Sequence, residues 1–325
     1  MEDMTAGFGA SGDYVVGKRT ATVLISYEDA LEAVRQGDIT RFQPRIQTSV
    51  RRRGFAAIKY ILCGPPPLHE DLVADRDLAF CMAACPFSND DILHHQVLQT
   101  IYRKLTGSRF DCPRYGTHWE QVGFQGTDPA TDLRGVGFLA LLHLLYALTT
   151  PRTAHLIHDI YKLSHDEVQN FPLCIMSINM TRIAVQGLRE GCLNKWCNHG
   201  NQVVAVLNDF YMGTFLRMYH IWKHERKTIR DSGFVLQDVE KYVKKHPAMV
   251  LRTLEAHAHA PERRRSPSPP NVTMSPLHPE ELDEYINERY PSTDDLDDMP
   301  AEDISSKNFF TVCKDDGDDN LGNLI

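Results

Sequence analysis

Long hydrophobic runs are scarce in this chain of 325 residues. The longest, residues 136–148 (VGFLALLHLLYAL), contains His143 and is shorter than the roughly 20 apolar residues that a transmembrane helix needs. The first ten residues, MEDMTAGFGA, lack the basic-then-apolar order of a signal peptide. We therefore expect a cytoplasmic protein with no transmembrane segment, in which residues 136–148 form a buried helix.

Cysteine is sparse as well, with eight residues in the whole chain. That number over this length does not indicate a disulfide framework, and a reducing compartment would keep the thiols free. The spacing of Cys81 and Cys85, and that of Cys192, Cys197 and His199, differs from the CxxC pairs of structural zinc sites. We therefore expect small buried thiols in place of a metal centre.

Motifs of the common catalytic classes are missing or lack their structural context. The sequence has no GxSxG nucleophile elbow and no HExxH zinc motif. Residues 7–12 (GFGASG) match GxGxxG, but no strand precedes them and no helix follows. The segment from Gly12 to Lys18 resembles a P-loop, yet Arg19 stands where a Ser or Thr must bind magnesium. A flexible N-terminus is the favoured interpretation, and we expect no cofactor.

Excess acidic charge is found only near the end of the chain. From Pro279 to Ile325 there are 15 acidic and three basic residues, whereas the first 278 residues hold 28 acidic and 32 basic ones. The nearly neutral body does not indicate a nucleic-acid partner, and we expect none. Arg51–Arg53 and Arg263–Arg265 suit a phosphate or nuclear-import patch, but a solvated helix face and a charged linker are favoured.

Alternating strand patterns are nearly absent, with Thr22 to Ile25 as the one short strand-like stretch. Apolar residues at three- and four-residue spacing predict an all-α fold instead. Ser26 and Asn89–Asp91 are expected to cap helices, and Gly107 to end one. The first predicted helix begins after Ser26. The other predicted helical segments are residues 42–62, 72–82, 92–105, 137–149, 153–163, 171–190, 200–224 and 235–256.

Composition and periodicity divide the chain into five parts. We expect a flexible N-terminus over residues 1–20 and an N-terminal helical extension over 21–92 that packs on the core. A multi-helix domain follows over 93–247, and its last helix ends over 248–260. Residues 261–325 combine a Pro/Ser-rich linker with the acidic tail, a composition that predicts disorder.

The most informative segment is residues 119–144 (WEQVGFQGTDPATDLRGVGFLALLHL), where a polar loop leads into a fully apolar helix. Asp128 and Pro129 predict a turn or a helix start. The side chains of Thr131 and Asp132 are expected to bond to nearby backbone amides.

Arg134 leaves this segment where Gly135 and Gly137 interrupt regular helix. Two interpretations are open from the residues alone. Arg134 pairs with Asp132 or caps backbone carbonyls, while the glycines let helices pack closely. Alternatively, Arg134 presents its planar fork of donors to a phosphate group.

Twelve positions of this segment match the signature of the ELMO domain in its GTPase-activating form, and the chain therefore resembles that family over about residues 93–247. The matching positions are Trp119, Gly123, Phe124, Gln125, Pro129, Thr131, Asp132, Arg134, Gly135, Gly137, Leu141 and Leu144.

The resemblance implies an all-α domain that activates Arf-family small GTPases of the Arf-like protein 2 type. It implies that Arg134 is an arginine finger acting in trans on the GTP-bound partner, which supplies its own nucleotide site and magnesium. Gln125 either positions the loop or contacts the nucleotide. We assign Trp119, Phe124, Leu141 and Leu144 to packing that holds the loop.

The alternative function is a non-catalytic scaffold or adaptor in actin-cytoskeleton or Rac-type GTPase signalling, as the larger ELMO proteins imply. The arginine at position 134 favours the activator. The resemblance also implies association with the actin cytoskeleton and with actin-rich cell projections such as stereocilia.

Overall fold

The structure is a computed structural model, and it describes residues 21–259 apart from 55–57, 59, 61 and 63. All regular structure in this described part of the chain is helical, so the predicted all-α fold is confirmed. The GxGxxG segment, the flexible N-terminus predicted for 1–20 and the disordered tail predicted for 261–325 lie outside the described residues.

The elements are α1 (Tyr27–Gln36), η1 (Ile39–Arg45), η2 (Glu70–Leu72), α3 (Val73–Ala84), α4 (Ile92–Thr106), α5 (His118–Gln121), η3 (Pro129–Gly135), α6 (Gly137–Thr149), α7 (Pro151–Ser164), α8 (Leu173–Glu190), α9 (Asn194–Gly200), α10 (Val204–His224), η4 (Ile229–Asp231), α11 (Ser232–Lys245) and α12 (Pro247–His259).

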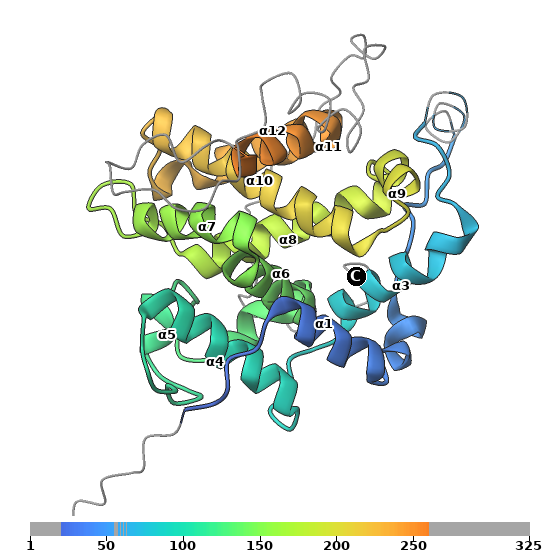
Figure 1. Ribbon diagram of the computed structural model, residues 1–325. Helices are drawn as coiled ribbons and strands as arrows, with labels where there is room; N and C mark the ends of the chain where they lie inside the picture. The colour runs from blue at the N-terminus through green and yellow to red at the C-terminus, as the bar shows by residue number, and fades with distance from the viewer. Residues whose placement is uncertain (1–20, 55–57, 59, 61, 63, 260–325) are drawn as a thin grey trace, which may run out of the picture.

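Two helices organise the core (Figure 1). Every residue of α6 from Gly137 to Ala147 is buried, and α1, α3, α4, α7 and α8 pack around it. α10 packs against α8, α11 and α12, which extends the same core. A helix that is apolar on all sides must be surrounded by other helices, and this is how the run at 136–148 avoids water.

No single helix in the described part of the chain is long and apolar enough to span a membrane. The pair η3 and α6 has the required length and composition, but the chain bends by 107° between these two helices.

Several helix ends lie where the capping residues predicted them. The Ser26 hydroxyl accepts a hydrogen bond from the Asp29 amide (3.1 Å) at the start of α1. The Asp91 carboxylate accepts one from the Leu93 amide (2.9 Å) at the start of α4. Gly107 ends α4 with φ 71°, a left-handed conformation that glycine adopts without steric cost.

The predicted helix over 42–62 is wrong for its first half. Pro44 lies inside a short 3₁₀ helix that ends at Arg45, and Ile46 is already extended. The backbone beyond it is held by α8: the Arg189 side chain donates to the Gln47 carbonyl (2.9 Å). Pro44 and this contact with α8 thus disfavour a regular helix here despite the apolar spacing.

Two further predicted helices differ in extent. Residues 200–224 contain the end of α9 and all of α10, separated at Asn201, which has φ 50°. Residues 235–256 are two helices, because Pro247 begins α12 and disfavours helical backbone at His246.

The start of α10 is capped from a distant part of the chain. One carboxylate oxygen of Asp75, in α3, accepts hydrogen bonds from the amides of Val203 (2.7 Å) and Val204 (3.0 Å). α10 has no side-chain cap from its own neighbouring residues. An acidic group at a helix N-terminus also interacts favourably with the helix dipole, so this contact fastens α10 to α3.

Asp75→Ala should therefore lower the free energy of unfolding by about 1–2 kcal/mol, since two amides lose their acceptor. Asp75→Asn keeps one acceptor oxygen and should lose less. Asp71→Ala is the matched control, because Asp71 is exposed and lies one turn earlier. Urea denaturation of the three variants checks the prediction, and equal losses for Asp71 and Asp75 would contradict it.

Candidate functional site

Residues 119–144 form α5, a tight loop, η3 and α6 in succession. The helix start that Asp128 and Pro129 predicted is present, because η3 begins at Pro129 with Asp128 as its N-cap. Arg134 lies at the end of η3, just before the chain turns into α6. The turn places Arg134 at the surface, while the helix that follows enters the core.

Arg134 is exposed and forms no hydrogen bond or ion pair with any residue of the described part of the chain. In particular it does not pair with Asp132, the structural alternative that the sequence left open. Burial raises the pKa of the Asp132 carboxyl, and the positive charge of Arg134 opposes that rise. The guanidinium therefore keeps its full set of donors for another molecule.

Gly123 lets the loop before η3 lie directly against α8. Its φ is 92°, and a Cβ atom at this position would be 2.2 Å from the Leu173 nitrogen. The Gly123 carbonyl accepts a hydrogen bond from the Ile175 amide (3.0 Å). Only glycine fits both the backbone conformation and the close approach.

Gly137 plays the same part on the other side of η3. Its φ is 53°, and a Cβ atom would be 2.5 Å from the carbonyl oxygens of both Ala83 and Cys85 at the end of α3. The next amide, that of Phe138, donates to the Cys85 carbonyl (2.7 Å). The first turn of α6 is thereby fastened to α3, which determines where η3 and Arg134 lie.

Asp132 joins the loop to η3 from inside. Its carboxylate is buried and accepts a hydrogen bond from the Gln125 amide (2.7 Å). Burial raises the pKa of Asp132 to about 6, and the nearby Asp128 adds to the rise, while the Gln125 amide and Arg134 oppose it. The Gln125 amide therefore helps to hold the loop, while its side chain is exposed and the nucleotide contact stays a prediction.

The start of η3 is fixed by its own cap. The Asp128 carboxylate accepts a hydrogen bond from the Ala130 amide (2.9 Å), and Pro129 is buried in the first position of the helix. The Thr131 hydroxyl donates a hydrogen bond to the Asp128 carbonyl (2.7 Å). The side chains of Asp128 and Thr131 thus both stabilise the turn.

Trp119 closes the loop against the core. Its side chain is fully buried, and its indole N–H donates to the Arg114 carbonyl (2.9 Å). Tyr102 and Phe124 contact it edge-on, with ring centroids 5.4 and 5.9 Å away. Leu141 and Leu144 of α6 are buried in the same core cluster.

Arg114 is a part of this loop that the sequence analysis missed. Its guanidinium forms an ion pair with Asp128 (2.8 Å) and donates from Nε to Asn89 (2.8 Å). It also lies over the rings of Phe87 and Tyr115, at 4.7 and 4.6 Å from their centroids. Nothing in the local pattern distinguishes this arginine from a solvated one, since its partners come from other parts of the chain.

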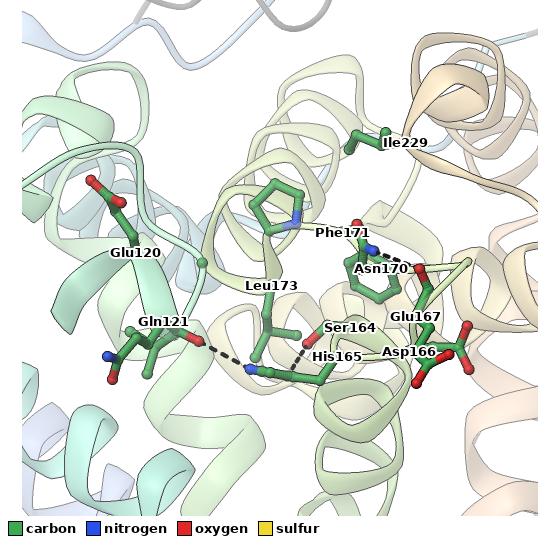
Figure 2. A pocket seen from close by; sticks show the side chains of 13 residues that line it. Glu120, Gln121, Ser164, His165, Asp166, Glu167, Asn170, Phe171, Leu173 and Ile229 are labelled. Carbon is green, nitrogen blue, oxygen red and sulfur yellow. Dashed lines mark hydrogen bonds between the residues drawn. The ribbon is translucent and has the colours of Figure 1, made fainter. Parts of the chain in front are cut away.

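A groove of about 480 Å³ lies behind the loop, between α5 and the connection from α7 to α8 (Figure 2). Across it, Nε2 of His165 lies 3.1 Å from the Gln121 carbonyl, and Nδ1 lies 3.0 Å from the Tyr161 carbonyl. The lining residues include Gly123 but not Arg134. The contact between His165 and Gln121 therefore supports the base of the loop, and the groove itself does not include Arg134.

Within residues 21–259, apart from the few that are not described, no three His, Cys, Asp or Glu side chains converge closely enough to bind a metal ion.

The fold and the site together define an all-helical domain in which a braced turn presents one unpaired arginine to solvent. A family model described as the ELMO/CED-12 family matches residues 77–236, which include the whole segment from Trp119 to Leu144. Residues 77–236 therefore form a domain of the ELMO/CED-12 family.

Similar proteins carry the name of the same domain. The chain is 52% identical to ELMO domain-containing protein 3 of Bos taurus and 50% identical to that of Homo sapiens, each over 234 residues. Both alignments cover 72% of this chain and 61% of the relative, so the chain spans about three fifths of these relatives. It is 24% identical over 166 residues to ELMO domain-containing protein B of Dictyostelium discoideum, covering 51% of this chain and 57% of that protein. No solved structure matches.

Trp119→Ala should lower the free energy of unfolding by about 3–5 kcal/mol, because it leaves a large cavity and an unbonded Arg114 carbonyl. Trp119→Phe keeps part of the ring packing and should cost less. Phe234→Ala is the control, since that ring is 79% exposed. Chemical denaturation checks the order, and an unchanged midpoint for Trp119→Ala would show that the indole does not hold the loop.

Asp132→Asn should change how stability depends on pH between about pH 4 and pH 6. The folded pKa is raised from 3.8 to about 6, so the protonated acid stabilises the fold below pH 3.8 and this contribution disappears as the pH rises through 6. Asn keeps an acceptor for the Gln125 amide and carries no charge. Relative to wild type, the variant should gain about 3 kcal/mol of stability between pH 4 and pH 7. A difference that stays constant over this range in denaturation experiments would contradict the assignment.

Proposed function

We propose that this protein is a GTPase-activating protein for GTP-bound Arf-family small GTPases, and that it supplies Arg134 in trans as an arginine finger. The single observation that carries the proposal is the exposed, unpaired guanidinium of Arg134 at the end of a turn that the core holds on both sides. The match of residues 77–236 to the ELMO/CED-12 family supports it.

The chemistry of GTP hydrolysis suits such an arginine. As the bond to the γ-phosphate breaks, negative charge develops on the phosphate oxygens and on the leaving oxygen. A planar guanidinium donates to two of these oxygens at once, and an arginine supplied by a partner accelerates hydrolysis by about 10³–10⁵. The GTPase binds the nucleotide and magnesium itself, so the activator needs to contribute the arginine alone.

The surroundings of Arg134 reduce the cost of placing it. η3 is held by the buried Asp132, and its two flanks are held by Gly123 and Gly137 against α8 and α3. A turn that is already rigid loses little backbone freedom on binding, so more of the contact energy remains for the transition state.

Single-turnover GTP hydrolysis by a panel of Arf-family GTPases, with and without this protein, tests the proposal. Arf-like protein 2 is the first to try, because the family resemblance points to it. We expect a large acceleration for at least one member. GTP-dependent binding without acceleration would favour the adaptor function instead, and an unchanged rate across the whole panel would contradict GTPase activation.

Arg134→Lys should reduce the acceleration by about tenfold or more, because lysine keeps the charge but loses the two-pronged donor. The melting temperature should not change, since Arg134 forms no hydrogen bond or ion pair in the described part of the chain. Arg109→Lys is the matched control, because Arg109 is also an exposed loop residue. Full activity of the Arg134 variant would show that the arginine is not the finger.

A further inference from the structure

Gly135, the residue that follows Arg134, differs from the glycines on either side of η3. It is exposed, and no atom lies within 4 Å of the position that a Cβ atom would occupy. Its φ is outside the left-handed range in which glycine is favoured. Gly123 and Gly137 are required by backbone conformation and close packing, whereas neither reason applies at Gly135.

A glycine without such a reason weakens the fold. Glycine loses more conformational freedom on folding than alanine does, so alanine at a compatible position normally raises stability. Residue 135 is the last residue of a 3₁₀ helix, a conformation that alanine adopts readily. Neither the backbone conformation nor the packing of the described residues thus requires glycine at this position.

Gly135 differs from other glycines with open surroundings because it directly follows Arg134. Consecutive Cα atoms are about 3.8 Å apart, so the backbone of Gly135 lies beside the stem of Arg134. A protein that encloses the Arg134 guanidinium in its nucleotide site must also pack against this backbone. A side chain at residue 135 would stand in open space directly in the path of that protein.

We propose that Gly135 is a contact position for the GTPase, whose main chain packs against the bare backbone at this residue. The inference rests on the proposed function, since it takes a GTP-bound GTPase as the partner of Arg134. Gly135 then affects how tightly the GTPase binds, whereas Arg134 contacts the phosphates.

Gly135→Ala and Gly135→Leu test this contact in single-turnover hydrolysis with increasing activator concentration. The activator concentration for half-maximal acceleration should rise about tenfold for Ala and further for Leu, since each added group must be accommodated at a close interface. The maximal rate should change much less, because Arg134 is still present. The melting temperature of the Ala variant should equal or exceed that of wild type.

Gly233→Ala is the matched control. Gly233 lies in α11, also has no atom within 4 Å of its Cβ position, and has no left-handed φ. It should leave the half-maximal concentration unchanged. An Ala variant at residue 135 that melts lower than wild type would show that the fold itself requires this glycine, and the inference would be overturned.

Direct binding of the protein to a GTPase loaded with a non-hydrolysable GTP analogue separates the inference from the proposed function. Acceleration by wild type with equal half-maximal concentrations for wild type and Gly135→Ala would overturn the inference alone. Binding by wild type without acceleration would overturn the proposed function, and weaker binding of Gly135→Ala would still support the contact. Neither binding nor acceleration by wild type would overturn both.

Discussion

The close approach of α6 to the end of α3 is the constraint on which the rest of the site depends. Gly137 permits it, because any larger residue would place a Cβ atom 2.5 Å from two carbonyl oxygens. The hydrogen bond from the Phe138 amide to the Cys85 carbonyl (2.7 Å) then fixes the first turn of α6. Since α6 is the most buried helix of the domain, its starting point determines where η3 ends and where Arg134 reaches the surface.

The site divides its residues between support and presentation. The aromatic and aliphatic positions of the segment, such as Trp119 and Leu141, are buried in the core. Asp132 is also buried, which raises the pKa of its carboxyl, and its carboxylate accepts a hydrogen bond from the Gln125 amide. At the surface, directly before α6, lie the guanidinium of Arg134 and the bare backbone of Gly135. A charged group presented in this way can be placed accurately in a partner without first rearranging the domain.

Helices with local signals were predictable, and those shaped by distant contacts were not. Ser26, Asp91 and Gly107 mark helix ends through bonds to residues close in sequence, so α1 and α4 were located well. Periodicity also located α6, because its apolar run can only be buried. The helix expected over 42–62 is absent from the first half of that range, where the Gln47 carbonyl bonds to Arg189, which is far away in the sequence.

The sequence by itself determined the all-α class, the apolar helix after residue 136, and the twelve positions that include Arg134, since propensity, periodicity and motif spacing are local properties. The tertiary structure decided which glycines are obligatory, because the demand at Gly123 and Gly137 comes from α8 and α3. It also decided that Arg114 braces the loop and that Asp75 caps α10. These roles depend on contacts between residues that are distant in the sequence, and local spacing does not predict such contacts.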